Sequence, residues 1–290
     1  MKEIKSVSQL VGEANRGSCK ISDVVLRIQS EQMGVSQDEI IGKMHRQLSV
    51  MKQAAKGGFG DKRSASGLSG GMAKRYSESS QSGRLLSGVA HRAIAIALAV
   101  AEHNACMGLI VASPTAGSCG ILPGVLLSVG ELYHKSDVEL VSGLFNSAGI
   151  GMVIAKRAFV SGAQGGCQAE CGSAAAMAAS AAVELMDGTP EMCAWACAFS
   201  LKFTMGLVCD PVAGLVEVPC VKRNASNAAI ALTAAELALT GIESAIPADE
   251  VIDAMRDVGL KMPEALKETS LGGLAATKTA KAIENRLYMA

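Results

Sequence analysis

Cysteines mark the places where this 290-residue chain could do chemistry, because several of them lie in glycine-rich, irregular sequence. Three such segments carry them: residues 112–124 with Cys119, 161–168 with Cys167, and 206–220 with Cys209 and Cys220. Thiolates are soft ligands for zinc, copper and iron–sulfur clusters, so thiols from separate loops could meet at one metal site. No Cys-x-x-Cys pair is present, so the spacing typical of zinc ribbons, thioredoxin-like sites and ferredoxins is missing.

Three well-separated loop cysteines could hold a [4Fe–4S] cluster and leave one iron open to bind a substrate as a Lewis acid. The simpler alternative is burial, because free cysteine behaves as a small apolar side chain. An odd count of nine cysteines, in a chain without an export signal, argues against a disulfide framework. Cys193 and Cys197 are four apart in an apolar helical stretch, where burial in the core is the simpler interpretation. Cys19 and Cys106 receive no role.

A second feature is the hydroxyl-rich turn SPTAGS, residues 113–118, ahead of a helix expected to begin near Pro123. The hydroxyls of Ser113, Thr115 and Ser118, with free backbone amides around Gly117, could bind a substrate carboxylate. An ordinary Gly/Pro turn is the structural alternative. Lys74 could add a positive charge to such a site, or be a solvated surface lysine.

A general base is harder to find. The chain has four histidines, none within a recognisable nucleophile or base arrangement. Only His103 lies close in sequence to the hydroxyl-rich turn, which makes it the one histidine to consider as a base.

The elements that must position these groups are helices. Apolar residues at helical spacing, with little strand-like alternation, predict a mainly α chain: a single helical domain, 1–290, whose glycine-rich loops converge on a cluster site. We expect a polar helical N-terminal part, 1–75, and an apolar helical core, 76–290. Capping boxes at Ser36–Glu39 and Ser136–Glu139, and the N-cap at Thr189, mark three helix starts. The predicted core helices cover 84–106, a stretch from 123, 136–159, 170–186, a stretch from 190, 223–239, and short stretches after 247 and 273. The loop 57–71 is expected to be an active-site flap, with disorder as the alternative.

Composition narrows the class of protein. The 27 basic and 27 acidic residues cancel, so no net charge favours nucleic acid or an anionic membrane as a partner. The longest uncharged run, 107–130, is interrupted by Pro114 and Pro123, and a spanning helix needs about 20 continuous apolar residues. The N-terminus lacks the apolar stretch of a signal peptide. We therefore expect a cytoplasmic protein that binds neither membrane nor nucleic acid.

Four segments in order give a more specific indication: SPTAGSCGILPG (113–124), GCQAECG (166–172), CDPVAGLVEVPCVKRNA (209–225) and ETSLGGLAAT (268–277). They closely resemble the iron–sulfur-dependent bacterial L-serine dehydratases (L-serine deaminases), and the match to the α subunit of the two-chain form covers nearly the whole sequence. The resemblance implies that Cys167, Cys209 and Cys220 bind a [4Fe–4S] cluster. It leaves Cys119 as a reserve ligand or a buried thiol, and Cys171 as a neighbour.

The implied reaction converts L-serine to pyruvate and ammonia, with the open iron assisting departure of the β-hydroxyl as water. Pyridoxal phosphate is not expected, because the cluster activates the leaving group. The resemblance supports a substrate-binding role for Thr115 and Gly117, and Arg223 and Asn224 follow the last cysteine closely enough to support the cluster.

The family's base comes from a Ser-Ser-His-Thr motif, carried on the β subunit in two-chain enzymes, and no such motif occurs here. We therefore expect this protein to need a β subunit as its partner. Some relatives end in a cysteine that caps the open iron, whereas this sequence ends in Ala290, so greater oxygen sensitivity is expected. The alternatives are a cysteine desulfidase or related lyase on the same domain, or a non-catalytic metal-binding scaffold.

Overall fold

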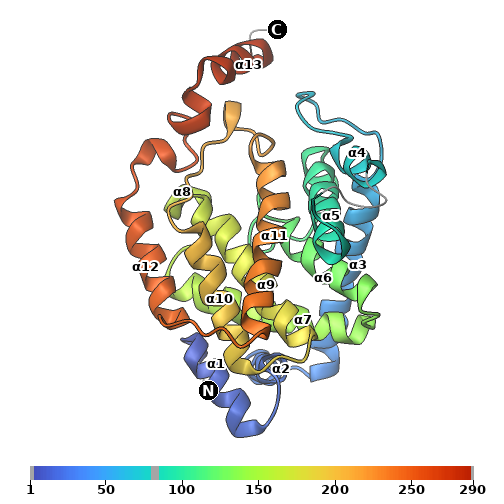
Figure 1. Ribbon diagram of the computed structural model, residues 1–290, viewed down its shortest axis with the longest axis vertical. Coiled ribbons are helices and arrows are strands. Elements are labelled where there is room, and N and C mark those ends of the chain that lie inside the picture. The colour runs from blue at the N-terminus through green and yellow to red at the C-terminus, as the bar shows by residue number, and fades with distance from the viewer. Residues whose placement is uncertain (1–2, 80–84, 289–290) are drawn as a thin grey trace.

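A computed structural model describes residues 3–79 and 85–288 of the chain. Within these residues it is helical and contains no β-strand, which confirms the predicted mainly α class (Figure 1). The α-helices are α1 (Val7–Gly17), α2 (Ile21–Met33), α3 (Gln37–Gly58), α4 (Met72–Glu78), α5 (Gly88–Ala105), α6 (Ile121–Leu132), α7 (Asp137–Arg157), α8 (Gly162–Gly165), α9 (Ser173–Leu185), α10 (Pro190–Thr204), α11 (Cys220–Leu239), α12 (Ala248–Lys261) and α13 (Lys278–Tyr288).

Helix α9 is the centre of the molecule. Every residue of its sequence, SAAAMAASAAVEL, is buried. Four helices, α6, α7, α10 and α11, pack around it (Figure 1). A helix covered on all sides has no polar face, and small side chains let the surrounding backbones approach closely. The alanine-rich sequence of α9 is therefore what allows five helices to share one core.

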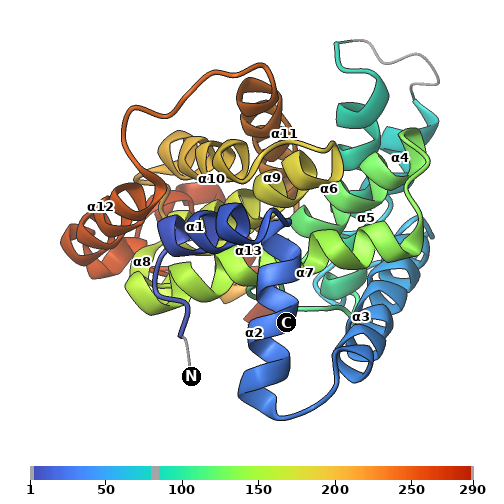
Figure 2. The same ribbon diagram turned by 90° about the horizontal axis from the view of Figure 1, so that it is seen from below.

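The polar N-terminal part contributes to the same core. Leu10 of α1, Val25 of α2, and Leu48 and Met51 of α3 belong to the apolar cluster that contains the residues of α9. Figure 2 shows α1 and α2 lying across the underside of the bundle. Each of these helices therefore has an apolar face against the bundle and a polar face outward.

Helix starts that carry their own cap agree with the sequence. At α7 the Ser136 hydroxyl accepts from the Glu139 amide, and the Glu139 carboxylate accepts from the Ser136 amide at 2.7 Å. At α10 the Thr189 hydroxyl accepts from the Met192 amide, with Pro190 as the first helical residue. These local hydrogen bonds fix the first turn without help from distant residues.

Several helix starts differ from the expectation. Helix α6 begins at Ile121 and not near Pro123, and α11 begins at Cys220 and not at Arg223. Neither start has a side-chain cap of its own. Residues 168–172, expected as α-helix in part, form a π-helical turn, η1 (Gln168–Gly172), before α9. The helix predicted over 84–106 begins later, at Gly88, and Arg84 itself lies outside the described residues.

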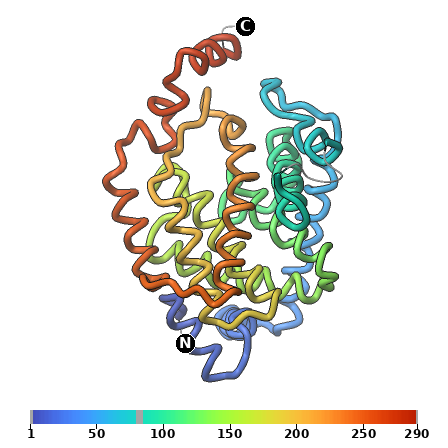
Figure 3. Tube along the Cα trace, viewed as in Figure 1, coloured from blue at the N-terminus to red at the C-terminus, as the bar shows by residue number. Residues whose placement is uncertain are grey.

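The C-terminal segment forms an arm that extends from the bundle, at the end opposite the N-terminus (Figure 3). Its last helix, α13, packs on the short turn η2 (Val212–Gly214), and Ala280 shares a small apolar cluster with Val212 and Ala213. The Tyr288 hydroxyl donates to the Ala213 carbonyl at 2.9 Å. The arm therefore covers the loop that carries Cys209.

Helix α7 is the one helix among the described residues that is long and apolar enough to cross a membrane. Most of that stretch is buried, and it packs against α9 and α2. These are the contacts of a core helix.

A polar network lies within the core between α2, α7 and α9. The Glu184 carboxylate accepts from the Ser22 amide at 3.2 Å and from the Asn146 side-chain amide at 2.8 Å. The Asn146 carbonyl oxygen accepts from the Ser180 hydroxyl at 2.7 Å. The second Glu184 oxygen has no hydrogen-bond partner among the described residues. Burial raises the pKa of Glu184, and the hydrogen bonds only partly offset it.

Glu184→Gln should therefore change stability in a pH-dependent way. Because the native pKa is raised, the wild-type carboxyl favours folding below the unfolded-state value of 4.5, and this contribution is lost as pH rises through the native pKa. The variant has no charge to bury. Between pH 4.5 and 8, its free energy of unfolding should therefore rise relative to that of the wild type by on the order of 1 kcal/mol. Urea unfolding at several pH values measures the difference.

Glu139→Gln is the control with the opposite sign, because hydrogen bonds from Ser136 lower the pKa of the exposed Glu139. The free energy of unfolding of that variant should decrease relative to that of the wild type as pH rises. A stability difference for Glu184→Gln that stays constant with pH would contradict the assignment.

Candidate metal centre

The three cysteines expected to bind a metal come from three separate elements. Cys167 lies between α8 and the π-helical turn η1, Cys209 lies in the loop after α10, and Cys220 is the first residue of α11. All three side chains are buried, with at most 5% exposed. Thiols from distant parts of the sequence are thus all shielded from solvent.

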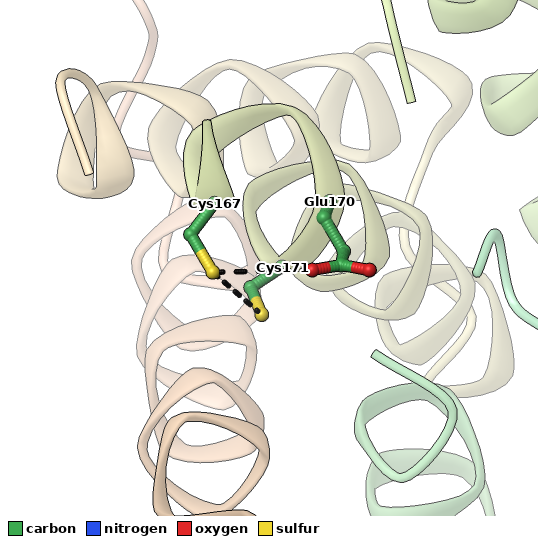
Figure 4. A group of neighbouring side chains, drawn as sticks. All are labelled: Cys167, Glu170 and Cys171. Atoms are coloured by element: carbon green, nitrogen blue, oxygen red, sulfur yellow. Dashed lines mark hydrogen bonds between the residues drawn. The ribbon is translucent and has the colours of Figure 1, made fainter. Parts of the chain in front are cut away.

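Cys167 is the centre of this group. Its sulfur lies 3.8 Å from the Cys171 sulfur and 4.0 Å from a Glu170 carboxylate oxygen. Figure 4 shows the three side chains directed to the same side of the π-helical turn. One ligand atom from each of the three lies within 4.8 Å of the other two, which is close enough to share a metal ion. The structure therefore adds Cys171 and Glu170 to the groups that surround Cys167.

The surroundings of Cys167 favour its thiolate form. Hydrogen bonds from the Cys171 and Cys209 thiols, assisted by the positive charge of Arg223, hold the pKa of Cys167 well below its usual range. The same interactions, together with burial, raise the pKa values of Cys171 and Cys209. Burial and the negative charge of Cys167 raise the pKa of Cys220 to about 12. A bound cation would reverse this pattern, because coordination deprotonates thiols.

The Cys209 loop is held by the segment ETSLGGLAAT, residues 268–277, and by α11. The Cys209 amide donates to the Leu266 carbonyl at 2.9 Å. The Glu268 amide donates to the Cys209 carbonyl at 2.7 Å. The Asp210 carboxylate accepts from the Leu274 amide at 2.7 Å and forms a 2.8 Å ion pair with Arg223. One motif of the sequence thus fixes the cysteine of another.

The hydroxyl-rich turn lies next to the cysteines. Thr115 donates a short hydrogen bond to Glu170, and its hydroxyl lies 3.1 Å from that of Ser118, which is fully buried. Ser113 is also buried, and its hydroxyl donates to the Val111 carbonyl at 3.2 Å. At Gly117 an added Cβ would lie 2.5 Å from a Glu170 oxygen, so only glycine leaves room for this carboxylate.

Glu170 joins the turn to the cysteines, and sequence reasoning did not select it. Its side chain is 6% exposed, and burial raises its pKa to about 7, opposed by the Thr115 hydrogen bond. The signal was available in the sequence. A glutamate in an otherwise apolar helical stretch must either reach solvent or have a specific partner.

Asn224 connects the turn to the start of α11. Its side-chain amide donates to the Gly117 carbonyl at 2.7 Å and to the Cys220 carbonyl at 2.9 Å. Its oxygen accepts from the Gly120 amide at 2.8 Å. Gly120 is the residue that precedes α6, so this long-range bond supplies a cap that the local sequence lacks.

The loop predicted as a flap is anchored on both sides. Because α3 continues to Gly58, the loop begins at Phe59. The buried Glu102 of α5 accepts from the amides of Gly70 and Ala73 at 2.7 and 2.9 Å, and from that of Met72. Ser66 donates to Glu217 in the segment that leads to Cys220, at 2.7 Å. The loop therefore packs against the cysteine-bearing segment in an ordered conformation.

Two predicted site residues lie in other surroundings. Lys74, on α4, forms an ion pair with Asp61 of the flap at 2.9 Å. The ring of His103, near the end of α5, packs against the backbone at Gly57 and Gly108. Burial, with the nearby charge of Lys62, lowers the pKa of His103 and so favours its neutral form.

The remaining cysteines are mostly core side chains. Cys193 and Cys197 are buried within α10, as the apolar stretch predicts, and Cys119 is 1% exposed. Burial raises the pKa of Cys119 to about 12. Cys106 is buried and Cys19 is half-buried. Burial without a charged partner makes a thiol inert.

Asn224→Ala should loosen the hydroxyl-rich turn. It leaves the Gly117 carbonyl and the Gly120 amide without partners, which costs about 2–4 kcal/mol of stability. Hydrogen exchange of the Gly120 amide should accelerate at least about tenfold, as measured by mass spectrometry. Asn227→Ala, one turn along α11, is the matched control, because the Asn227 amide bonds only within its own helix. Unchanged exchange at Gly120 in Asn224→Ala would contradict the assigned role.

The sequence is similar to a known protein family along most of its length. The family model for the serine dehydratase alpha chain matches residues 16–275. The probable L-serine dehydratase alpha chain of Bacillus subtilis is 47% identical over 285 residues, covering 98% of this chain and 95% of that protein. The L-serine dehydratase alpha chain of Peptoniphilus asaccharolyticus is 43% identical and covers 97% of each sequence.

A longer relative aligns with only part of its length. The L-serine dehydratase 1 of Escherichia coli is 41% identical over 181 residues, which is 62% of this chain but 40% of that protein. The matched family model and the near full-length relatives confirm the resemblance seen in the four motifs. This chain belongs to the serine dehydratase alpha chain family.

Proposed function

We propose that this chain is the catalytic α subunit of an L-serine dehydratase, a lyase that converts L-serine to pyruvate and ammonia. The observation that carries the proposal is the buried group of Cys167, Cys171 and Glu170 beside the hydroxyl-rich turn, with the Cys209 thiol hydrogen-bonded to Cys167. Family membership and the names of the relatives support serine as the substrate. The net charge of zero fits a small-molecule substrate better than nucleic acid, and we propose a cytoplasmic location.

The donor set fits a [4Fe–4S] cluster held by Cys167, Cys209 and Cys220. Thiolates are the ligands such clusters use, the sulfurs are shielded from water, and Arg223 balances negative charge beside Cys167. When bound, the cluster would supply a Lewis-acidic iron that polarises the serine hydroxyl. Pyridoxal phosphate has no part in this proposal.

The protein's own residues would bind and orient the substrate. Ser113, Thr115 and Ser118 bring hydroxyls, and the backbone at Gly117 brings the turn close to Glu170. The buried setting excludes bulk water, which strengthens each of these contacts. Lys74 remains a proposed cationic contact, one that would require the flap to move Lys74 away from Asp61.

The general base is proposed to come from a β subunit. The alpha chain designation of the relatives implies a partner subunit. The longer Escherichia coli relative extends well beyond the part that this sequence matches, so it has room for such a region. His103 is the alternative base within this chain, and its lowered pKa favours the neutral form that can accept a proton.

Replacing Cys167, Cys209 or Cys220 by serine should each abolish the cluster. Loss of one thiolate should remove the brown chromophore and reduce pyruvate formation more than about 100-fold. Iron and sulfide analysis after anaerobic purification measures the effect. Cys197→Ser is the matched control, since this thiol is buried in α10 and should leave the iron content unchanged. Iron loss in Cys171→Ala but not in Cys220→Ser would transfer the ligand role to Cys171.

The isolated α subunit should form no pyruvate, whereas anaerobic reconstitution with the candidate β subunit should restore activity. His103→Gln should keep most of that activity, because the base is supplied by the partner. Full activity of the isolated α subunit, lost in His103→Gln, would assign the base to this chain instead. Product assays with L-serine, L-threonine and L-cysteine separate the dehydratase from a cysteine desulfidase. An iron-free protein that is inactive with all three amino acids would favour a scaffold.

A further inference from the structure

Glu170 is a buried carboxylate whose partners do not neutralise it. Thr115 donates to one oxygen, and the Cys167 sulfur lies 4.0 Å from the other. No salt bridge to Glu170 occurs among residues 3–79 and 85–288. Arg223 is the nearby cation, but its guanidinium forms an ion pair with Asp210 and donates to the Val208 carbonyl. A buried carboxylate keeps its charge at a high cost unless a positive partner joins it.

The position of Glu170 indicates what that partner is. One oxygen faces Thr115 and Gly117 in the hydroxyl-rich turn, and the other faces Cys167. A ligand held between the turn and the cysteines must therefore pass beside this carboxylate. In serine the α-ammonium and the β-hydroxyl are carried by adjacent carbon atoms. A substrate that directs its hydroxyl toward the cysteines thus brings its ammonium within reach of Glu170.

We propose that Glu170 binds the α-ammonium group of the substrate and so selects amino acids over hydroxy acids that lack it. The inference rests on the proposed function and deepens it, because it names the group that recognises the amine. Thr115 holds the carboxylate in place through its hydrogen bond, and the missing side chain at Gly117 leaves space for it. An ammonium would bring Glu170 both hydrogen-bond donors and a positive charge, whereas the hydroxyl of a substrate brings one uncharged donor and its carboxylate brings none.

Glu170→Gln tests this in the holoenzyme assembled with the β subunit. It removes the charge and keeps the shape, so KM for L-serine should rise at least about tenfold, more than kcat falls. Inhibition by 3-hydroxypropanoate, which is serine without its amino group, should be unchanged or stronger. Calorimetric titration of the α subunit before the β subunit is added, when no pyruvate should form, compares the affinities for L-serine and 3-hydroxypropanoate without turnover. Iron content should equal that of the wild type.

Glu184→Gln is the matched control, because it makes the same change at another buried glutamate, on α9. It should leave unchanged both KM for L-serine and the ratio of the affinities for L-serine and 3-hydroxypropanoate. If Glu170→Gln does not fold, Glu170→Asp withdraws the charge by one methylene and should weaken L-serine binding more than 3-hydroxypropanoate binding.

Equal changes for both ligands overturn the proposal, as does loss of iron in Glu170→Gln, which would make Glu170 a ligand or a structural group. A wild-type holoenzyme without iron or pyruvate formation overturns the proposed function instead. In that case the two affinities measured by calorimetry, for L-serine and for 3-hydroxypropanoate, still decide whether Glu170 recognises the ammonium.

Discussion

The close packing of four helices on α9 is the constraint on which the rest of the structure depends. Only small side chains allow α6, α7, α10 and α11 to surround one helix, and all of α9 is buried. The π-helical turn η1 leads directly into α9, and α11 begins with Cys220. The packed helices thus position Cys167 and Cys220, whereas Cys209 is held in the loop after α10 by the backbone of Leu266.

Buried charge at that end needs compensation, and the compensation links the motifs to one another. Arg223 lies between the Asp210 carboxylate and the Cys167 sulfur, while Asn224 satisfies backbone groups of the hydroxyl-rich turn. Neighbouring residues of α11 thus reach two different loops. Polar groups in a low-dielectric interior stabilise when fully paired and destabilise when not. This makes the position of each loop dependent on the others, as a site built from distant segments requires.

The periphery of the site is arranged by the same means. Glu102 of α5 accepts three amides at the end of the flap, and the arm carrying α13 covers the turn η2. Both contacts act on loops that have little apolar area to bury. These loops are therefore held in place by hydrogen bonds to a buried carboxylate and by a small apolar cluster, whereas the rest of the chain is held by helix packing.

The sequence alone determined the mainly α class and the helices with local caps. Its motifs also identified the cysteines and the hydroxyl-rich turn as candidate site residues. Ser136 and Thr189 could be identified as caps because their hydrogen bonds close within one helical turn. The start of α6 could not, since Gly120 is held by Asn224, which lies 104 residues away on α11.

Only the tertiary structure decided that Glu170 joins the turn to the cysteines, that Cys171 lies 3.8 Å from Cys167, and that Lys74 pairs with Asp61. Residue type and spacing describe what a segment can do. Which segments meet depends on the packing of helices far apart in the sequence, and no local pattern contains that information.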